Sequence, residues 1–119
     1  MNLIVKGVPV PKPQHMKRGP LWQQSKRVKD YRNWQEIVRW TCVGKIDRSQ
    51  PSYALAMVFY LPTRDAAKRG HRHTGTPDID NLTKGILDSL FEHDQCVWRI
   101  LVEKFYDDGG GPRLEVQIT

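Results

Sequence analysis

Four aspartates and one lysine are concentrated in a stretch of seventeen residues: Asp78, Asp80, Lys84, Asp88 and Asp94. Carboxylate oxygens suit Mg²⁺, which often takes one or two carboxylates together with substrate phosphates. A bound divalent ion activates water and neutralises the charge that develops on a phosphate under attack. Without a cation, converging carboxylates repel one another, so a stable fold has little need for them. These residue types therefore suit metal-assisted hydrolysis of a phosphodiester.

The same stretch is predicted to form a helix packed on a core. Its apolar residues recur at i, i+3, i+7, i+8 and i+11 from Ile79 to Leu90. That spacing is typical of one buried helix face. Asp78 stands at the expected N-cap, and Asp94 follows the expected end of the helix. The lysine and the two middle aspartates share a ridge beside the apolar face.

Each polar residue here also has an ordinary structural interpretation. Asp78 could be a cap, and Asp80 a first-turn acid favoured by the helix dipole. Lys84 could be only the i+4 partner of Asp80, worth about 0.2–0.5 kcal/mol. Asp88 could be a solvated ridge residue, and Asn81 could either orient a ligand or be a plain surface amide. The joint pattern, more than any single residue, favours catalysis.

Charge is distributed unevenly along the 119 residues, whose net charge is +6. Residues 1–32 contain eight lysines and arginines and one acid, and residues 62–77 add four basic residues, one acid and two histidines. Residues 78–119 contain nine acids and four basic residues. Neutralising phosphates gives salt-dependent, sequence-independent affinity. The pattern therefore favours a nucleic-acid partner over a basic surface that only aids solubility.

Basic and aromatic residues of the first and second basic regions are candidate DNA contacts. The expected phosphate contacts are Lys12, Lys17, Arg18, Arg64, Lys68, Arg69 and Arg72. Trp22 could stack on an unpaired base or be buried between subunits. His71 and His73 have no partner at metal-ligand spacing, so we expect them to face phosphate.

Composition indicates a single globular domain. Hydrophobic residues make up 39% and charged residues 27% of the chain, which is typical of soluble proteins. No apolar run approaches the roughly 20 residues that span a bilayer. The first residues do not read as a signal peptide, and Cys42 and Cys96 follow no disulfide or metal pattern. We therefore expect reduced thiols and a cytoplasmic protein.

Periodicity predicts the element order β-α-β-α-β-β. Strands are expected at residues 2–8, 53–61, 97–106 and 113–118, and helices at 28–43 and from 78 onward. Residues 1–27 then comprise the first strand and a proline-rich basic arm, and residues 62–77 form a flexible basic loop. The glycine-rich turn at 107–112 predicts that the last two strands pair as an antiparallel hairpin.

This order predicts a two-layer α/β or α+β domain. A mixed sheet of about four strands would carry the two main helices on one face.

Several runs of the chain resemble the RusA family of Holliday-junction resolvases, the crossover junction endodeoxyribonucleases. They are D-I-D-N-L-T-K at 78–84, I-L-D-S-L at 86–90, D-Q-x-V at 94–97 and G-V-P-V-P-K at 7–12. Tyr31 opens the first helix as a tyrosine does in that family. The resemblance extends from about residue 5 to the C-terminus.

The resemblance implies a homodimeric, Mg²⁺-dependent endonuclease, with Mn²⁺ as a substitute, that nicks four-way DNA junctions symmetrically. Asp78, Asp80 and Asp94 match the metal-binding catalytic aspartates, and Lys84 matches the lysine needed for cleavage. Asp88 matches a recurrent acid that could support the metal ligands. It also implies a bacterial, prophage or phage origin. A nuclease for flaps or other branched DNA, or a non-catalytic module that binds junctions or single strands, is the alternative.

Asp94 could complete the site in two ways. Asp80 and Asp88 are separated by a rise of about 12 Å on a helix, and six further residues can return at most about 20 Å. A cluster within one chain is therefore feasible with little slack. The other arrangement completes the site across a dimer.

Overall fold

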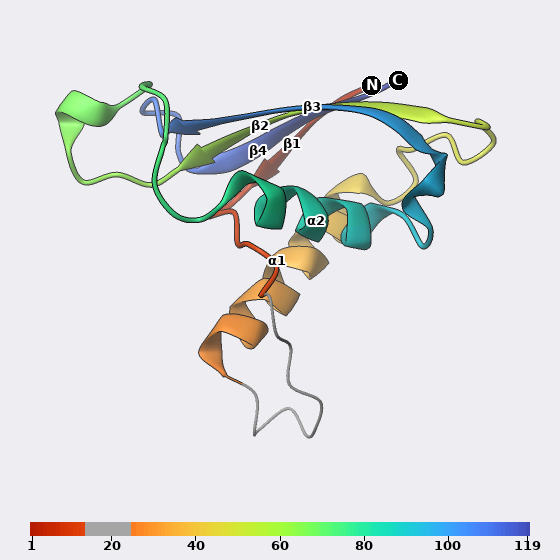
Figure 1. Ribbon diagram of the computed structural model, residues 1–119, viewed down its shortest axis with the longest axis horizontal. Coiled ribbons are helices and arrows are strands. Elements are labelled where there is room, and N and C mark those ends of the chain that lie inside the picture. The colour runs from red at the N-terminus through yellow and green to blue at the C-terminus, as the bar shows by residue number, and fades with distance from the viewer. Residues whose placement is uncertain (14–24) are drawn as a thin grey trace.

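A computed structural model describes residues 1–13 and 25–119 as a four-stranded sheet with two helices on one of its faces (Figure 1). The strands are β1 (Asn2–Lys6), β2 (Tyr53–Leu61), β3 (Val97–Tyr106) and β4 (Arg113–Ile118). The helices are α1 (Lys26–Cys42) and α2 (Ile79–Leu90), and short 3₁₀ turns are η2 (Ala66–Lys68) and η3 (Asp94–Cys96). The predicted α+β class and element order are confirmed.

The sheet has the order β1-β4-β2-β3, which corrects the predicted terminal hairpin. β3 pairs in parallel with β2, and β4 pairs antiparallel with both β1 and β2. β4 buries every second side chain, whereas β3 has no buried residue and half of its residues are exposed. Burial therefore requires β4 to be an inner strand and leaves β3 at the edge. The six residues 107–112 reach up to about 20 Å, enough to cross β2, because two strand spacings are about 10 Å.

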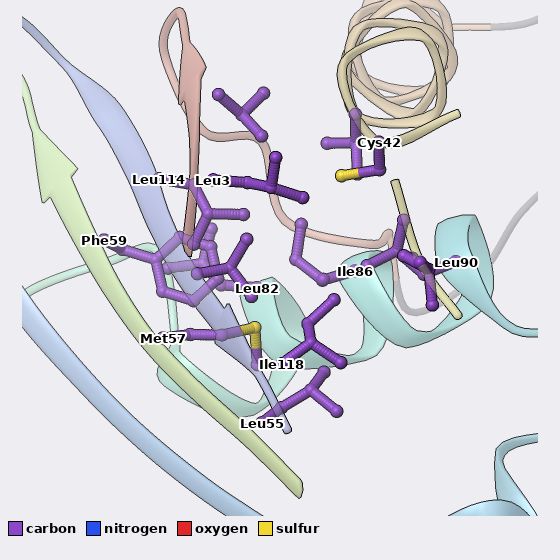
Figure 2. Packing of buried hydrophobic residues seen from close by; sticks show 14 of the residues in the cluster. Leu3, Cys42, Leu55, Met57, Phe59, Leu82, Ile86, Leu90, Leu114 and Ile118 are labelled. Atoms are coloured by element: carbon purple, nitrogen blue, oxygen red, sulfur yellow. The ribbon is translucent and has the colours of Figure 1, made fainter. Parts of the chain in front are cut away.

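Strict alternation along β2 builds the centre of the core. Its five odd-numbered residues are buried against the helices, while the residues between them are only half-buried. Leu82 and Ile86 of α2 are fully buried over Phe59 and Met57, as Figure 2 shows. The predicted apolar face of α2 is thus confirmed, except that its first member, Ile79, is 40% exposed.

Helix α1 packs across α2 and the edge strand β1. It begins at Ser25, whose hydroxyl accepts a hydrogen bond from the N–H of Val28. Tyr31 and Trp34 are buried, whereas Ile37 is 43% exposed. Tyr31 meets α2 at Gly85, where a β-carbon would lie 3.0 Å from the tyrosine ring. The helices approach this closely because position 85 has no side chain.

The basic segment 62–77 is partly attached to the edge of the sheet. Three main-chain hydrogen bonds of 2.9–3.2 Å join residues 70, 71 and 73 to Tyr106 and Lys104 of β3. Whether the rest of the segment is flexible stays a prediction. Within the described residues, no helix is both long and apolar enough to cross a membrane.

Candidate active site at the start of helix α2

Asp78 occupies the N-cap of α2 without using its carboxylate as a cap. Its backbone is extended (φ −69°, ψ 142°), and its carbonyl accepts the first helical hydrogen bond, from the N–H of Leu82 at 3.1 Å. Its side chain makes no capping hydrogen bond and is exposed. Asp78 is therefore the N-cap of α2 by position, as predicted, but its side chain does not cap the helix. The carboxylate is left for another ligand.

Asp80 lies in the first turn and faces Lys84 one turn later. One carboxylate oxygen accepts a hydrogen bond from the N–H of Asn81 at 2.9 Å, and the other lies 3.9 Å from Lys84 Nζ. Both side chains are more than 60% exposed. Such a pair contributes at most about 1 kcal/mol and is screened by salt. The fold does not depend on it.

A hollow of about 380 Å³ opens beside the start of α2, and we call it the polar hollow. Asp78 and Asn81 line it from α2, Lys12 from the N-terminal arm, and Arg27 from the first turn of α1. The N–H of Lys12 donates to the carbonyl of Asn81 at 3.0 Å, which fixes the arm against α2. The lining thus combines the carboxylate residue Asp78 with the basic residues Lys12 and Arg27. Arg27 was not predicted as a site residue, because only the fold brings the start of α1 here.

Asp88 lies two turns further along α2 and forms an ion pair with Lys12. Burial, and then the nearby charge of Asp88, raises the pKa of Tyr31 to about 12, so this phenol stays protonated. Its hydroxyl accepts a hydrogen bond from Gln35 at 3.0 Å. The ion pair with Asp88 means that Lys12, which was predicted as a phosphate contact, is already paired with an acid.

Lys104 of β3 holds the loop that leads into α2. Its ammonium donates to the carbonyls of Gly75 at 2.7 Å and Pro77 at 2.8 Å, directly before Asp78. His73 lies beside Lys104 and is only 9% exposed. Its ring packs against that of Tyr106, with 4.5 Å between the ring centroids. Burial, and then the charge of Lys104, lowers the pKa of His73. A neutral, buried imidazole does not match the predicted phosphate contact.

Asp94 lies beyond the opposite end of α2, in η3. The twelve residues of α2 rise about 18 Å, so the helix separates Asp94 from Asp78 and Asp80. Asp94 shares a small hollow with Asp88 instead. Among the residues that the structure describes, no three acidic, histidine or cysteine side chains are grouped to hold a metal.

The predicted phosphate contacts of the basic segment lie at the same end of the sheet as the start of α2 (Figure 1). Arg64, Lys68, Arg69 and Arg72 are all exposed there, as is His71. Lys17, Arg18 and Trp22 lie outside the described residues. The end of the sheet at which β2 and β3 finish therefore carries both the acids and a basic rim.

Comparison with known proteins agrees with this geometry. A family model described as "Endodeoxyribonuclease RusA" matches residues 6–119. The chain belongs to the RusA family. It is a Holliday-junction resolvase endodeoxyribonuclease, and branched DNA is its substrate class. Searches of curated proteins and of solved structures found no match.

The donor chemistry of this RusA-family site fits a magnesium ion. Asp78 and Asp80 offer carboxylate oxygens that no buried ion pair occupies. Mg²⁺ is commonly held by one or two carboxylates, substrate phosphates and water. Two aspartates are therefore a sufficient set from this end of α2.

Proposed function

We propose that the enzyme cuts four-way DNA junctions by paired, symmetric nicks, as a homodimer that requires Mg²⁺ and accepts Mn²⁺. The observation that carries this proposal is the uncommitted carboxylate of Asp78 in the polar hollow, which Arg27 and Lys12 also line. A phosphodiester needs both a metal-binding acid and cations for its oxygens, and this hollow supplies both.

Each side chain at the start of α2 has a part in the reaction. Asp78 and Asp80 would hold Mg²⁺, which supplies an activated water and charge neutralisation when bound. Arg27 and Lys12 bind the oxygens of the scissile phosphate. Lys84 orients the carboxylate of Asp80 and adds positive charge where the phosphate becomes more negative. Asn81 and Asp88 support this group, the latter through Lys12.

Asp94 enters the site from the second subunit in this proposal. The separation of about 18 Å along α2 supports that arrangement over a cluster within one chain. Two coordinated cuts on a two-fold substrate require two sites related by two-fold symmetry, which a C2 dimer supplies.

The basic rim binds the backbones of the junction arms. Arg64, Lys68, Arg69 and Arg72, with Lys17 and Arg18 of the arm, neutralise phosphates outside the cut. Affinity should fall steeply with salt, because each neutralised phosphate releases condensed counterions. We propose that the enzyme acts in the cytoplasm of a bacterial cell and is encoded by a bacterial, prophage or phage gene.

The decisive experiment compares a labelled four-way junction with a flap and a linear duplex in Mg²⁺. Paired nicks are expected in the junction, little cutting in the other two, and none with Asp80→Asn. Preferential cutting of the flap would instead indicate a nuclease for other branched DNA. Tight binding without cutting in Mg²⁺ or Mn²⁺ would overturn the enzymatic proposal and leave a junction- or single-strand-binding module.

A further inference from the structure

A second hollow, of about 410 Å³, adjoins the polar hollow. The two share one wall, which is made by Pro11, Arg27, Thr76 and Pro77. We call the second one the apolar hollow, because Val8, Pro9, Val10, Leu61 and Pro62 line it in addition to the shared prolines. Both volumes fall within the roughly 300–1,000 Å³ of small-molecule sites.

The two hollows differ in chemistry as the two halves of a nucleotide do. The polar hollow is lined by the acid Asp78 and by the basic residues Lys12 and Arg27. The apolar hollow offers mainly aliphatic walls, to which His73 and Asp30 add polar groups that the polar hollow does not share. Arg27 lies on the wall between them. A phosphate suits the first space, and an aromatic base suits the second.

The walls of the apolar hollow are held in place before any ligand binds. The arm that forms one wall is held by two main-chain hydrogen bonds. At its start the N–H of Gly7 donates to the carbonyl of Pro112, and at its end the N–H of Lys12 donates to the carbonyl of Asn81. The opposite wall is held by Lys104, through the carbonyls of Gly75 and Pro77. Prolines restrict both walls further. A ligand entering such a space loses little affinity to ordering of the protein.

We propose that the apolar hollow receives the base of a nucleotide beside the scissile phosphate, turned out of the DNA stack. This inference rests on the proposed function. The phosphate would then lie in the polar hollow, with Arg27 between phosphate and base. One carboxylate oxygen of Asp30 accepts a hydrogen bond from Lys26 Nζ at 2.9 Å. The other oxygen can accept a hydrogen bond from the amino group of a base. Unstacking costs a few kcal/mol and least where pairing is already weak, as at a junction centre.

Fluorescence of 2-aminopurine, which rises when the base unstacks, tests the proposal directly. The probe is placed in turn at each nucleotide within two of the cut, and the junction is bound by the Asp80→Asn enzyme so that it stays intact. A several-fold rise is expected at one position. Val8→Trp fills the hollow and should abolish the rise, whereas Val43→Trp, at the exposed C-cap of α1, should preserve it.

Cleavage by the same two substitutions in the active enzyme gives a second measurement. Val8→Trp should slow single-turnover cutting about 10- to 100-fold through misplacement of the phosphate. An abasic nucleotide at the position with the fluorescence rise should restore cutting by Val8→Trp, because no base then needs the space. Misfolding of the variant could not be rescued in this way.

The absence of a fluorescence rise at every position, while the active enzyme cuts the junction, would overturn the base-binding inference alone. Persistence of the rise in Val8→Trp would overturn it equally. Failure of the wild-type enzyme to cut any junction would overturn the proposed function instead.

Discussion

The two ends of α2 differ in how their polar groups are satisfied. At the C-terminal end, Arg39 Nε donates to the carbonyl of Ser89 at 3.3 Å, and an Arg48 nitrogen donates to that of Leu90 at 2.7 Å. Arg48 also lies over the ring of Phe91, which packs on Tyr53. Two cations thus satisfy the last carbonyls and complement the helix dipole.

At the N-terminal end the local side chains satisfy fewer groups. Asp78 makes no capping hydrogen bond, and Asp80 accepts one, from the N–H of Asn81 at 2.9 Å, beside its weak exposed pair with Lys84. The entering backbone is fixed from a distance by Lys104 of β3. One end is therefore anchored for stability, while the acids of the other are kept available in a backbone that a remote lysine positions.

The largest effect should come from Asp78→Asn. We expect cleavage to fall at least about 10²- to 10³-fold, as when a preorganised charged or polar group is lost from an active site. The melting temperature should scarcely change, because an exposed side chain without a hydrogen bond contributes within about 0.5 kcal/mol. Single-turnover cleavage and a thermal melt measure both. Retained cutting with a clear loss of stability would mean that Asp78 is structural after all.

Mixing Asp78→Asn with Asp94→Asn tests whether the two ends of α2 meet across a dimer. If each site takes Asp78 from one subunit and Asp94 from the other, a mixed dimer has one intact site. After exchange of subunits at equal amounts, about a quarter of the sites should recover, and they should give single nicks. If each chain forms its own site, both subunits of the mixed dimer carry a defect, and the mixture would stay inactive.

The position of Asp94 shows what spacing along a sequence cannot supply. The reach of six residues from Asp88 allowed the chain to return to the start of the helix. The chain instead continues outward, because Phe91 packs on Tyr53 and β3 must begin at Val97, which pairs with that same tyrosine. A contact between distant strands decides where Asp94 lies.

Periodicity predicted the elements well because each follows a local rule. A nearly continuous apolar run predicted β2, alternation predicted β4, and the i, i+3, i+7 pattern predicted α2. The order of strands was predicted wrongly because a glycine-rich turn favours neighbours in sequence, whereas the burial of Leu114, Val116 and Ile118 requires an inner strand. Arg27 and Lys104 were missed for a similar reason, since nothing local marks a cation that acts on a distant segment.

Arg48→Ala should break the anchored end and lower stability by about 1–2 kcal/mol, the range for a hydrogen bond from a charged donor at a helix C-terminus. For a domain of this size, the melting temperature should fall by about 5 °C. Arg32→Ala is the matched control, because Arg32 is exposed and pairs with no described acid. Cleavage at low temperature should stay close to wild type. A large loss of cutting by the folded variant would show that this end of α2 also serves the chemistry.

Lys12 connects the two ends, because it lines the polar hollow and pairs with Asp88. The contribution of this ion pair to stability should be the smallest effect. A double-mutant cycle of Lys12→Met and Asp88→Asn should give an interaction free energy of less than about 1 kcal/mol, because both side chains are more than a third exposed. Junction affinity should discriminate better. Lys12→Met should weaken binding and reduce the slope of log affinity against log salt by about 0.9, the value for one phosphate contact. Asp88→Asn should strengthen binding slightly, because it releases the ammonium and removes a negative charge. Equal weakening by both substitutions would mean that the ion pair shapes the site and that Lys12 does not contact DNA.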